Sequence, residues 1–462
     1  MKSRETAKIA VVGAGMAGLT ATQKLLAGGA EVTLFDKSQG PGGRASTLKR
    51  DSFFLNQGPH ALYKGGAAYE ILTKLNINPA GASPAPKRSL AILKGEILDL
   101  PIDATSIVAT KLLSIVEKIE WGMLMGGLAK TDLSKLHNVT LNQWLKSTVK
   151  SERVQELFTA LVRLATYCNS PEKISAAAAI QQLVLVQKDG VLYLDCGWQS
   201  LVDSMVQLIR SEGKDKLTEI YEAEVSAISV NTGGPQQEQE ERQERDQVEI
   251  TINGAKQNFD AVILALPPKQ VSRLLATGSS ETKTLQTTLD GILPSHAACL
   301  DVCLKKLPNL ENTFAIGIDE PLYYSVHSTT AKLAEANHAL IHLAVYLHEG
   351  EKGTDKHEHQ LLELLDKMQP GWQDELVYKR FLPNMAASFG TALASENGSN
   401  GLASVTLPMV TTQTKRDTVF VCGDWVGVGH LLVDAAMSSA VASAEAALAR
   451  AEKKAYAASS IT

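Results

Sequence analysis

The 462-residue chain lacks the features by which nucleic-acid-binding, secreted and metal-binding proteins are usually recognised. Its formal net charge is -5 and its lysines and arginines are scattered, so no basic patch for nucleic acid is expected. Its five cysteines are widely spaced and form no CxxC pair, which argues against a disulfide framework or a zinc site. Residues 1–8 lack the pattern of a secretory signal. We therefore expect a cytoplasmic protein without a metal ion or a nucleic-acid partner.

Long apolar runs are also missing. The nearest candidate for a membrane span, 106–128, is interrupted by charged residues at 111, 117, 118 and 120. Its amphipathic part, 107–128, has two interpretations. Such a helix usually covers a protein core, and it can also lie on a bilayer surface to admit a lipid-like substrate. Peripheral membrane contact is thus one expectation, whereas a transmembrane span is not expected.

The hydrophobic pattern predicts an α/β fold. With 44% hydrophobic residues the chain can bury a large core, and its length indicates two or three lobes. Residues 8–36 predict a βαβ unit with a parallel strand pair. Helical patterns dominate 81–187, and apolar runs between 297 and 347 predict an antiparallel sheet. We expect a Rossmann-like nucleotide-binding domain interleaved with an α+β substrate domain; the first comprises 1–80, 188–282 and 376–462, the second 81–187 and 283–375.

A polar tract at 231–247 separates two strand patterns, 220–230 and 248–253. The tract consists mainly of Gly, Gln, Glu and Arg and has almost nothing to bury. It is therefore predicted to be the disordered tip of a hairpin.

The strongest motif, Gly13-Ala14-Gly15-Met16-Ala17-Gly18, follows the first predicted strand and opens a helix. In such a loop the first glycine allows a tight turn, the second a close approach to a pyrophosphate, and the third close helix packing. The helix N-terminus then faces the phosphate charge. Asp36 ends the second strand, where a carboxylate can bind ribose hydroxyls. These residues predict a dinucleotide site but do not choose between NAD and FAD.

A second pair of glycines, Gly42-Gly43, is followed by Arg44 shortly after Asp36. The glycines allow another close approach of the backbone, and the guanidinium offers a fork of donors for phosphate oxygens. Alone, Gly-Gly-Arg is more often a turn with a solvated arginine. At this distance from a dinucleotide motif it favours a longer cofactor.

From Phe35-Asp36-Lys37 to Gly42-Gly43-Arg44 the sequence resembles the flavoprotein superfamily of monoamine oxidases, protoporphyrinogen oxidases and phytoene (carotenoid) desaturases. Other segments resemble motifs of this superfamily in the same order along nearly the whole chain, most closely those of the desaturase branch. They are Asn56-Gln57-Gly58-Pro59-His60, Gly197-Trp198-Gln199-Ser200-Leu201, Ala223-Glu224-Val225, Ala265-Leu266-Pro267-Pro268, and Gly423-Asp424-Trp425 with residues 434–439.

The resemblance implies a non-covalently bound FAD, so the nucleotide-binding domain would be an FAD-binding domain. The residues implied at the ADP half are Gly13, Ala14, Gly15, Met16, Ala17, Gly18, Asp36, Lys37, Gly42, Gly43, Arg44 and, at the adenine, Val225. Those implied at the flavin ring are Gln57, Gly58, Pro59 and His60. Gly423 and Asp424 are implied at the ribityl chain and its phosphate. Leu432, Val433 and Ala435 belong to the same C-terminal motif and are also implied to bind the cofactor.

Three positions depart from the superfamily's pattern. Asp36 stands where glutamate is common, which keeps NAD as an alternative. Asp434 and Ser439 stand where glycines are common, so contacts at the far edge of the flavin ring are less well defined. Members with a covalent flavin use a cysteine near this point, but Cys422 lies inside a predicted strand and is expected to be a small buried residue.

The resemblance implies an FAD-dependent oxidoreductase that takes a hydride from an apolar small molecule, with oxygen, a quinone or another acceptor reoxidising the flavin. Such a cofactor makes a catalytic triad unnecessary, and the sequence has no Gly-x-Ser-x-Gly and no His-Glu-x-x-His motif. His60 is the candidate catalytic residue for proton transfer, with a purely structural hydrogen bond as the alternative. Tyr63 and His430 are weaker candidates of the same kind.

Three other functions stay open. A flavin amine oxidase would need an aromatic pair facing the flavin, and Trp425 with Tyr63 or Tyr324 is a candidate pair. A redox-neutral flavin isomerase and a flavin-holding protein without turnover would use the same cofactor motifs.

Overall fold

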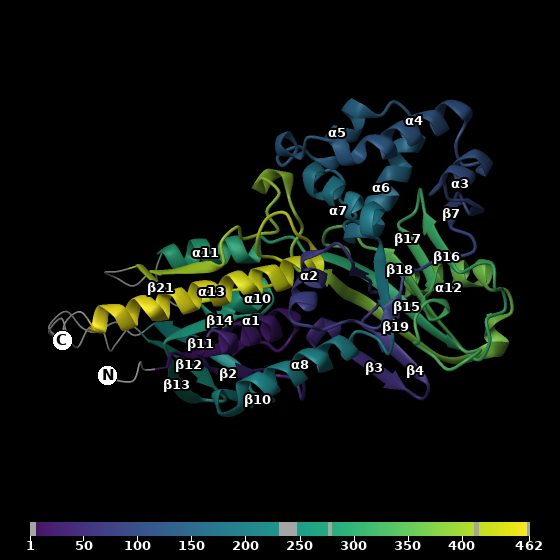
Figure 1. Cartoon of the computed structure of the whole chain (residues 1–462). Helices are drawn as coiled ribbons and strands as arrows, with labels where there is room; N and C mark the ends of the chain where they lie inside the picture. The colour runs from purple at the N-terminus through teal and green to yellow at the C-terminus, as the bar shows by residue number, and fades with distance from the viewer. Residues whose placement is uncertain (1–5, 231–246, 276–279, 411–414, 460–462) are drawn as a thin grey trace. The chain divides into compact units, whose positions relative to one another are not determined.

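The computed structural model describes residues 6–230, 247–275, 280–410 and 415–459, which fall into two compact units (Figure 1). Unit 1 comprises Met1–Ser46, Leu201–Ile292 and Asn400–Thr462, and unit 2 comprises Thr47–Ser200 and Leu293–Ser399. The chain leaves each unit and returns to it, which is the interleaved arrangement expected from the sequence.

The boundaries of the units differ from the expected ones. Residues 47–80, 188–200 and 376–399 lie in unit 2 rather than with the nucleotide-binding residues, and 283–292 lie in unit 1 rather than in the substrate domain. The reason is strand pairing that sequence patterns do not reveal. For example, β19 (Leu376–Ser388) pairs with β15 (Ser295–Leu304), a strand of the large sheet of unit 2.

Unit 1 is built on a six-stranded sheet of order β10-β2-β1-β14-β21-β20. β1 (Lys8–Val12), α1 (Met16–Ala27) and β2 (Glu31–Phe35) form the expected βαβ unit, with β1 and β2 parallel. Four of the five residues of β1 are buried, as in a central strand that is covered on both faces. The other strands are β10 (Leu217–Ile220), β14 (Ala261–Leu264), β21 (Lys415–Val421) and the antiparallel β20 (Thr406–Val410).

The helices of unit 1 include the longest one of the described chain, α13 (Leu432–Ser459), which packs along α1 (Figure 1). Its segment Leu432–Glu452 is the one described helix that is long and apolar enough to cross a membrane, and half of it is buried in the structure. Our expectation had considered only 106–128 in this respect. The other helices in the described part of unit 1 are α8 (Gln199–Gly213), α10 (Pro268–Leu274) and α11 (Ser280–Asp290).

A small antiparallel sheet of unit 1 contains the predicted hairpin. β11 (Val225–Val230) pairs with β12 (Val248–Ile252), and β13 (Ala255–Phe259) completes the sheet. The hairpin is thus confirmed, although Ile220 belongs to β10 instead. Residues 231–246 of the polar tract lie outside the described residues.

Unit 2 contains a seven-stranded sheet of order β19-β15-β18-β17-β16-β7-β8. All neighbouring pairs are antiparallel except β16 with β7. Helix α12 (Asp355–Met368) buries Leu361, Leu365 and Met368 in the apolar core on one face. The strands, in addition to β15 and β19, are β7 (Leu90–Leu93), β8 (Glu96–Asp99), β16 (Phe314–Gly317), β17 (Leu322–Val326) and β18 (Ala339–Tyr346).

The helices of unit 2 occupy much of the region predicted to be helical. The single helix expected at 107–128 is two helices, because the structure provides a separate cap for each. Asp103 accepts a hydrogen bond from the Ser106 N–H at the start of α3 (Ala104–Ala109), and Ser114 caps α4 (Ile115–Gly127). The others are α5 (Leu141–Thr148), α6 (Glu152–Thr166) and α7 (Ala176–Asp189).

Short elements complete unit 2. β3 (Thr47–Arg50) and β4 (Phe53–Asn56) form a hairpin that leads into the 57–60 segment. The remaining elements are β5 (Leu62–Tyr63), α2 (Ala67–Lys74), β6 (Gly81–Ala82) and β9 (Val191–Leu194).

Candidate functional site: a dinucleotide cradle and a glycine turn

The glycine loop after β1 adopts a conformation that only glycine allows. Gly13 has φ 105°, and a Cβ atom there would lie 2.5 Å from the carbonyl oxygen of Ala265. A Cβ atom on Gly18 would lie 1.7 Å from the carbonyl oxygen of Gly13. Both contacts are with backbone and cannot be relieved by a side-chain movement, so these two glycines fix how closely α1 approaches β1.

The N-terminus of α1 meets a second glycine loop. Gly15 is the N-cap, no side chain caps the helix there, and the first turn holds no acidic residue. Gly42 donates its N–H to the Ala14 carbonyl at 2.9 Å, and Gly15 and Gly42 form a parallel bridge. Backbone donors of an uncapped helix and the positive end of its dipole attract an anion. Ala14, Met16 and Ala17 thus belong to a cradle that fits a pyrophosphate.

Asp36 lies at the end of β2, beside this cradle. Its Oδ2 accepts the Ala14 N–H at 2.6 Å, and its Oδ1 accepts the Ser38 N–H at 2.8 Å. Each carboxylate oxygen has a second lone pair, so both can still accept a bond from a ribose hydroxyl. The two bonds fix the carboxylate at the edge of the loop, which fits the predicted role.

The chain around Val225 is tied to Asp36. Asp36 donates its N–H to the Ile220 carbonyl and accepts the Ala223 N–H at its own carbonyl, both at 3.0 Å. Val225 follows as the first residue of β11 and is largely buried. The structure therefore brings the predicted adenine and ribose residues together within unit 1. The side chain of Lys37 is exposed to solvent.

Arg44 and Asp424 form an ion pair in unit 1, with 2.7 Å between Nη1 and Oδ2. Asp424 is buried, whereas the Arg44 side chain is about one-third exposed. Two residues that were predicted separately to bind phosphate and ribityl oxygens are thus direct partners. Gly43 precedes Arg44 in a short 3-10 turn, and Gly423 precedes Asp424.

Ser439 explains one departure from the superfamily's pattern. Its hydroxyl accepts the Gly423 N–H at 3.0 Å and lies 3.1 Å from the Gly423 carbonyl. The serine therefore fixes the turn that carries Asp424 to α13. This contact is not apparent from the sequence, because serine in a helix gives no sign of what it binds. Leu432, Val433 and Ala435 lie in the first turn of α13, where Leu432 has φ 55°.

The remaining predicted residues lie in unit 2, in a turn at 57–60. Gly58 has φ 78° and donates its N–H to the Asn56 carbonyl at 3.0 Å. His60 Nδ1 lies 3.0 Å from the Gly58 carbonyl, and its ring packs edge-to-face with Trp198 at 5.2 Å. Gln57 and His60 are half-buried, whereas Pro59 is buried. These contacts give the turn a defined shape.

Three of the weaker candidates, Tyr63, Tyr324 and Trp425, are buried side chains that donate hydrogen bonds to backbone carbonyls. The Tyr63 hydroxyl donates to the Ala165 carbonyl at 2.8 Å. Tyr324 lies in the apolar core between the large sheet of unit 2 and α12, which we call the α12-side core. Its hydroxyl donates to the Asn312 carbonyl. Trp425 is buried and donates its indole N–H to the Leu266 carbonyl. His430 is an exposed loop residue. These contacts do not support a flavin-facing aromatic pair.

Cys422 is buried inside the sheet of unit 1, as expected, and burial raises the pKa of its thiol to about 12. All five cysteines are free thiols in the structure. The residues that the structure describes contain no group of three or more His, Cys, Asp or Glu that could hold a metal ion.

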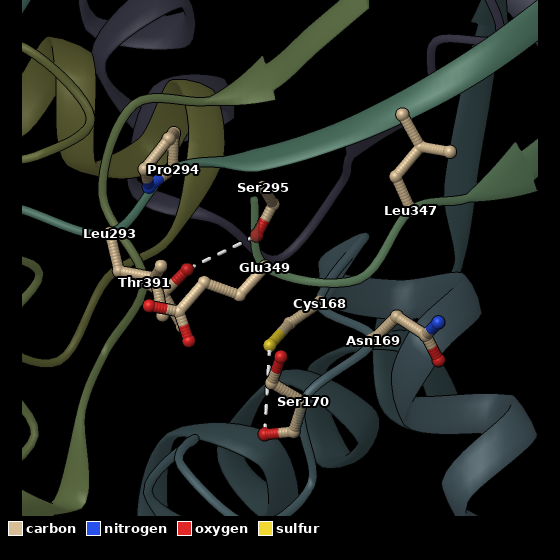
Figure 2. Close-up of a pocket in the computed structure, with 9 residues that line it drawn as sticks. All are labelled: Cys168, Asn169, Ser170, Leu293, Pro294, Ser295, Leu347, Glu349 and Thr391. Carbon is tan, nitrogen blue, oxygen red and sulfur yellow. Dashed lines mark hydrogen bonds between the residues drawn. The ribbon is translucent and has the colours of Figure 1, made fainter. Parts of the chain in front are cut away.

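Figure 2 shows a small pocket in unit 2 that does not coincide with any predicted residue. The volume that the centre of a water molecule can occupy in it is about 10 Å³, which corresponds to one water molecule. Ser295 and Thr391 form a hydroxyl hydrogen bond in its wall, and Cys168 lies against the Ser170 carbonyl. It is too small for an organic substrate.

A parallel sheet whose first strand ends in a glycine loop, with a carboxylate at the end of the next strand, defines a dinucleotide-binding protein. The model of the family described as flavin containing amine oxidoreductase matches residues 16–290, which are more than half of the chain. The protein therefore belongs to this family. As a member of this family it is an FAD-dependent oxidoreductase.

Comparison with a curated relative adds detail on a shorter stretch. The 4,4'-diapophytoene desaturase (4,4'-diaponeurosporene-forming) of Staphylococcus aureus (strain MRSA252) is 28% identical over 163 residues. The match covers 34% of this chain and 31% of that protein. The similarity thus spans about a third of the relative's length.

Solved structures resemble the chain over nearly its whole length. An oxidoreductase from Methanosarcina mazei has a TM-score of 0.70 at 17% identity, over 94% of this chain and 99% of that chain. Cyclohexylamine oxidase from Brevibacterium oxydans has a TM-score of 0.65 at 16% identity, over 97% and 99%. At these identities the likeness concerns the fold, and it confirms the α/β fold class predicted from the sequence.

Proposed function

We propose that the protein is a dehydrogenase or desaturase that removes a hydride from an apolar small molecule, with oxygen, a quinone or another acceptor reoxidising the flavin. When bound, FAD supplies a two-electron acceptor for this reaction. In this proposal the cradle of unit 1 holds the nucleotide half without a covalent bond, and residues 57–60 are the segment that the resemblance assigns to the flavin ring.

The observation that carries this proposal is that the groups beside Gly58 and Pro59 are apolar or neutral. A Cβ atom on Gly58 would lie 3.0 Å from Met385 Cε and 3.2 Å from Cys299 Sγ. Tyr167 donates its hydroxyl to the Pro59 carbonyl at 2.5 Å. Burial raises the pKa of Tyr167 and of Cys299 well above their ordinary values, so both stay neutral at physiological pH. Neutral, largely apolar contacts favour an apolar substrate over a charged one.

His60 is proposed to accept the proton that leaves the substrate. A desaturation removes one hydride and one proton from two neighbouring carbons, so the reaction needs a proton acceptor besides the flavin. The hydrogen bond to the Gly58 carbonyl makes Nδ1 the protonated nitrogen of the neutral ring, and Nε2 is then the basic atom. The bond to the backbone also orients the ring.

Peripheral membrane contact is proposed to give an apolar substrate access. Exposed apolar side chains gather on α3, on α4 and just before α3, and each is more than half exposed: Ile102, Val108, Ile115, Val116, Ile119 and Met123. Ile115, Ile119 and Met123 follow one another at helical spacing on α4, whereas Trp121 is buried in the core. A row of exposed apolar residues on one helical face fits the surface of a bilayer.

The test is the absorbance spectrum of the purified protein, followed by anaerobic bleaching of the flavin with a panel of polyenes, amines and porphyrinogens. Bleaching by a polyene supports the proposal. Bleaching by an amine alone favours the amine oxidase alternative. Conversion of a substrate by the reduced protein without net electron transfer indicates an isomerase, and a flavin that no compound bleaches indicates a flavin-holding protein.

A further inference from the structure

A line of three polar residues crosses the large sheet of unit 2. Asp301 on β15 stands opposite His342 on β18 in the antiparallel register, and opposite Arg380 on β19 on its other side. Side chains alternate between the two faces of a strand. The neighbours Leu300 and Val302 pack in the apolar α12-side core, so Asp301 points to the other face.

The three residues are connected through the Asp301 carboxylate. His342 Nδ1 lies 2.6 Å from Asp301 Oδ1, and both residues are fully buried. Arg380 donates to Asp301 Oδ2 from Nε at 2.9 Å and from Nη2 at 2.5 Å. Because a carboxylate oxygen can only accept a hydrogen bond, His342 donates from Nδ1. Asp301 contributes a carboxylate to this set and Arg380 a guanidinium, and the Arg380 side chain is largely buried as well.

Arg380 also reaches the start of the 57–60 turn. Its Nη2 donates to the backbone carbonyl of Asn56, the same carbonyl that accepts the Gly58 N–H. The Asn56 side chain is fixed independently, because its Oδ1 accepts bonds from Thr47 Oγ1 and the Trp198 N–H. A buried charge is therefore bonded directly to the backbone from which the turn begins.

The groups beside the line are neutral. His327 packs edge-to-face against His342 at 4.6 Å and stacks on Tyr193 at 3.9 Å. Burial lowers the pKa of His327 well below its ordinary value and raises that of Tyr193. A buried ion pair contributes little net stability in such a setting, because desolvation offsets the attraction. Its bond to the Asn56 carbonyl instead gives it an electrostatic effect on the turn.

We propose that Asp301 and Arg380 are positioning residues that set the electrostatic potential at the 57–60 turn and thereby the reduction potential of the flavin. The inference rests on the proposed function, in which this turn faces the flavin ring. Reduction adds negative charge to the flavin, so an added positive charge favours the reduced form and an added negative charge disfavours it. Asp301 and Arg380 nearly cancel each other in the native protein.

The test compares midpoint potentials of the FAD-loaded protein by spectroscopic redox titration in Asp301→Asn, Arg380→Gln and the double variant. Asp301→Asn leaves the arginine charge and is expected to raise the potential. Arg380→Gln leaves the carboxylate charge and is expected to lower it. The double variant is expected to return close to the native value. Opposite signs cannot arise from a general loosening of the fold.

Tyr324→Phe is the matched control, because it removes a buried hydrogen bond on the α12-side face of the same sheet. It is expected to lower thermal stability without shifting the potential. If Arg380→Gln does not fold, Arg380→Lys keeps the charge; it is expected to keep the potential and to speed amide exchange at Gly58. Equal potentials, or shifts of one sign in both single variants, would overturn the inference. Absence of FAD from the native protein would instead overturn the proposed function.

Discussion

Arg44 and Asp424 are joined by an ion pair of 2.7 Å although 380 residues separate them in the chain. The first follows the second glycine loop, and the second follows the last central strand of the parallel sheet. The pair therefore connects the first and the last chain segment of unit 1 beside the nucleotide cradle. It also gives the buried Asp424 carboxylate a cationic partner, which a carboxylate at this depth needs.

Replacement of Arg44 by glutamine is expected to weaken FAD binding and the fold of unit 1 together. A hydrogen bond to a charged group is worth roughly 1.5–3 kcal/mol, so we expect a stability loss of about that size. Loss of one phosphate donor is expected to weaken FAD affinity on the order of tenfold, or about 1.4 kcal/mol. Urea unfolding and fluorescence titration with FAD measure the two effects.

Arg88→Gln is the control for Arg44→Gln. Arg88 forms an ion pair of the same length with Asp99, but both side chains are more than 40% exposed. Exposed pairs of this kind contribute about 0–1 kcal/mol, so neither stability nor FAD affinity should change appreciably. Equal effects of the two substitutions would contradict the role given to Arg44.

Gly15→Ala separates cofactor binding from folding. Gly15 has φ -77°, which alanine tolerates, and the nearest atom to an added Cβ is the Gly42 carbonyl oxygen at 3.9 Å. The stability of the apoprotein should therefore change by less than about 1 kcal/mol. The methyl group would occupy the space where a pyrophosphate approaches, so FAD affinity is expected to fall at least about tenfold, or about 1.4 kcal/mol.

Gly40→Ala is the matched control for Gly15→Ala, since Gly40 precedes the second glycine loop and an added Cβ would meet nothing within 4 Å. It should change neither property. Calorimetric titration of both apoproteins with FAD gives the comparison. Native affinity in Gly15→Ala would show that the pyrophosphate does not approach this backbone.

Local chemistry is what made much of unit 1 predictable. The βαβ unit and its glycine loop could be read from the sequence because each glycine and the Asp36 carboxylate has a role in its own segment. In unit 2, helix α6 (Glu152–Thr166) likewise lies within 81–187, where helical patterns dominate the sequence. In both cases the signal comes from residues close together in the chain.

Contacts that depend on strand register could not be predicted in the same way. Asp301, His342 and Arg380 meet only because β15 lies between β18 and β19 in one particular register. The signal in the sequence was a single aspartate in an otherwise apolar run, which indicates a buried charge but not its partner. The boundaries of the units could not be predicted for the same reason. The sequences of β19 and β15 do not indicate that these two strands pair with each other.

His327 is expected to make the stability of the protein fall with pH below about 6.5. Burial lowers the pKa of the folded state well below the ordinary value, whereas the unfolded chain keeps a pKa near 6.5. Between these two values the unfolded state binds more protons, so the free energy of unfolding decreases as pH falls, by up to about 1.4 kcal/mol per pH unit. Above 6.5 both states are neutral and the contribution vanishes.

His327→Gln should flatten this part of the profile, because glutamine can still accept the hydrogen bond that the Tyr323 hydroxyl makes with Nε2. His359→Gln, at an exposed position on α12, is the control and should leave the native profile unchanged. Urea midpoints between pH 5 and 7 measure the difference. A profile for His327→Gln that is parallel to the native one would mean that another group causes the loss.

The exposed apolar face of α3 and α4 predicts binding to phospholipid vesicles. Replacement of Val116, Ile119 and Met123 by serine removes three side chains that are 58–76% exposed. Their mutual contacts contribute little to the core, so stability should change by less than about 1 kcal/mol. If each loses roughly 1 kcal/mol or more of transfer into the bilayer interface, vesicle binding should fall on the order of a hundredfold.

Leu310→Ser tests whether any exposed apolar residue has this effect. Leu310 is 66% exposed but lies between β15 and β16, away from both helices in the sequence. Co-sedimentation with phosphatidylcholine and phosphatidylglycerol vesicles should be lost in the triple variant and kept in Leu310→Ser. If the triple variant binds vesicles as strongly as the native protein, this face does not insert into membranes. Hydrophobic insertion depends on apolar area that the variant no longer has.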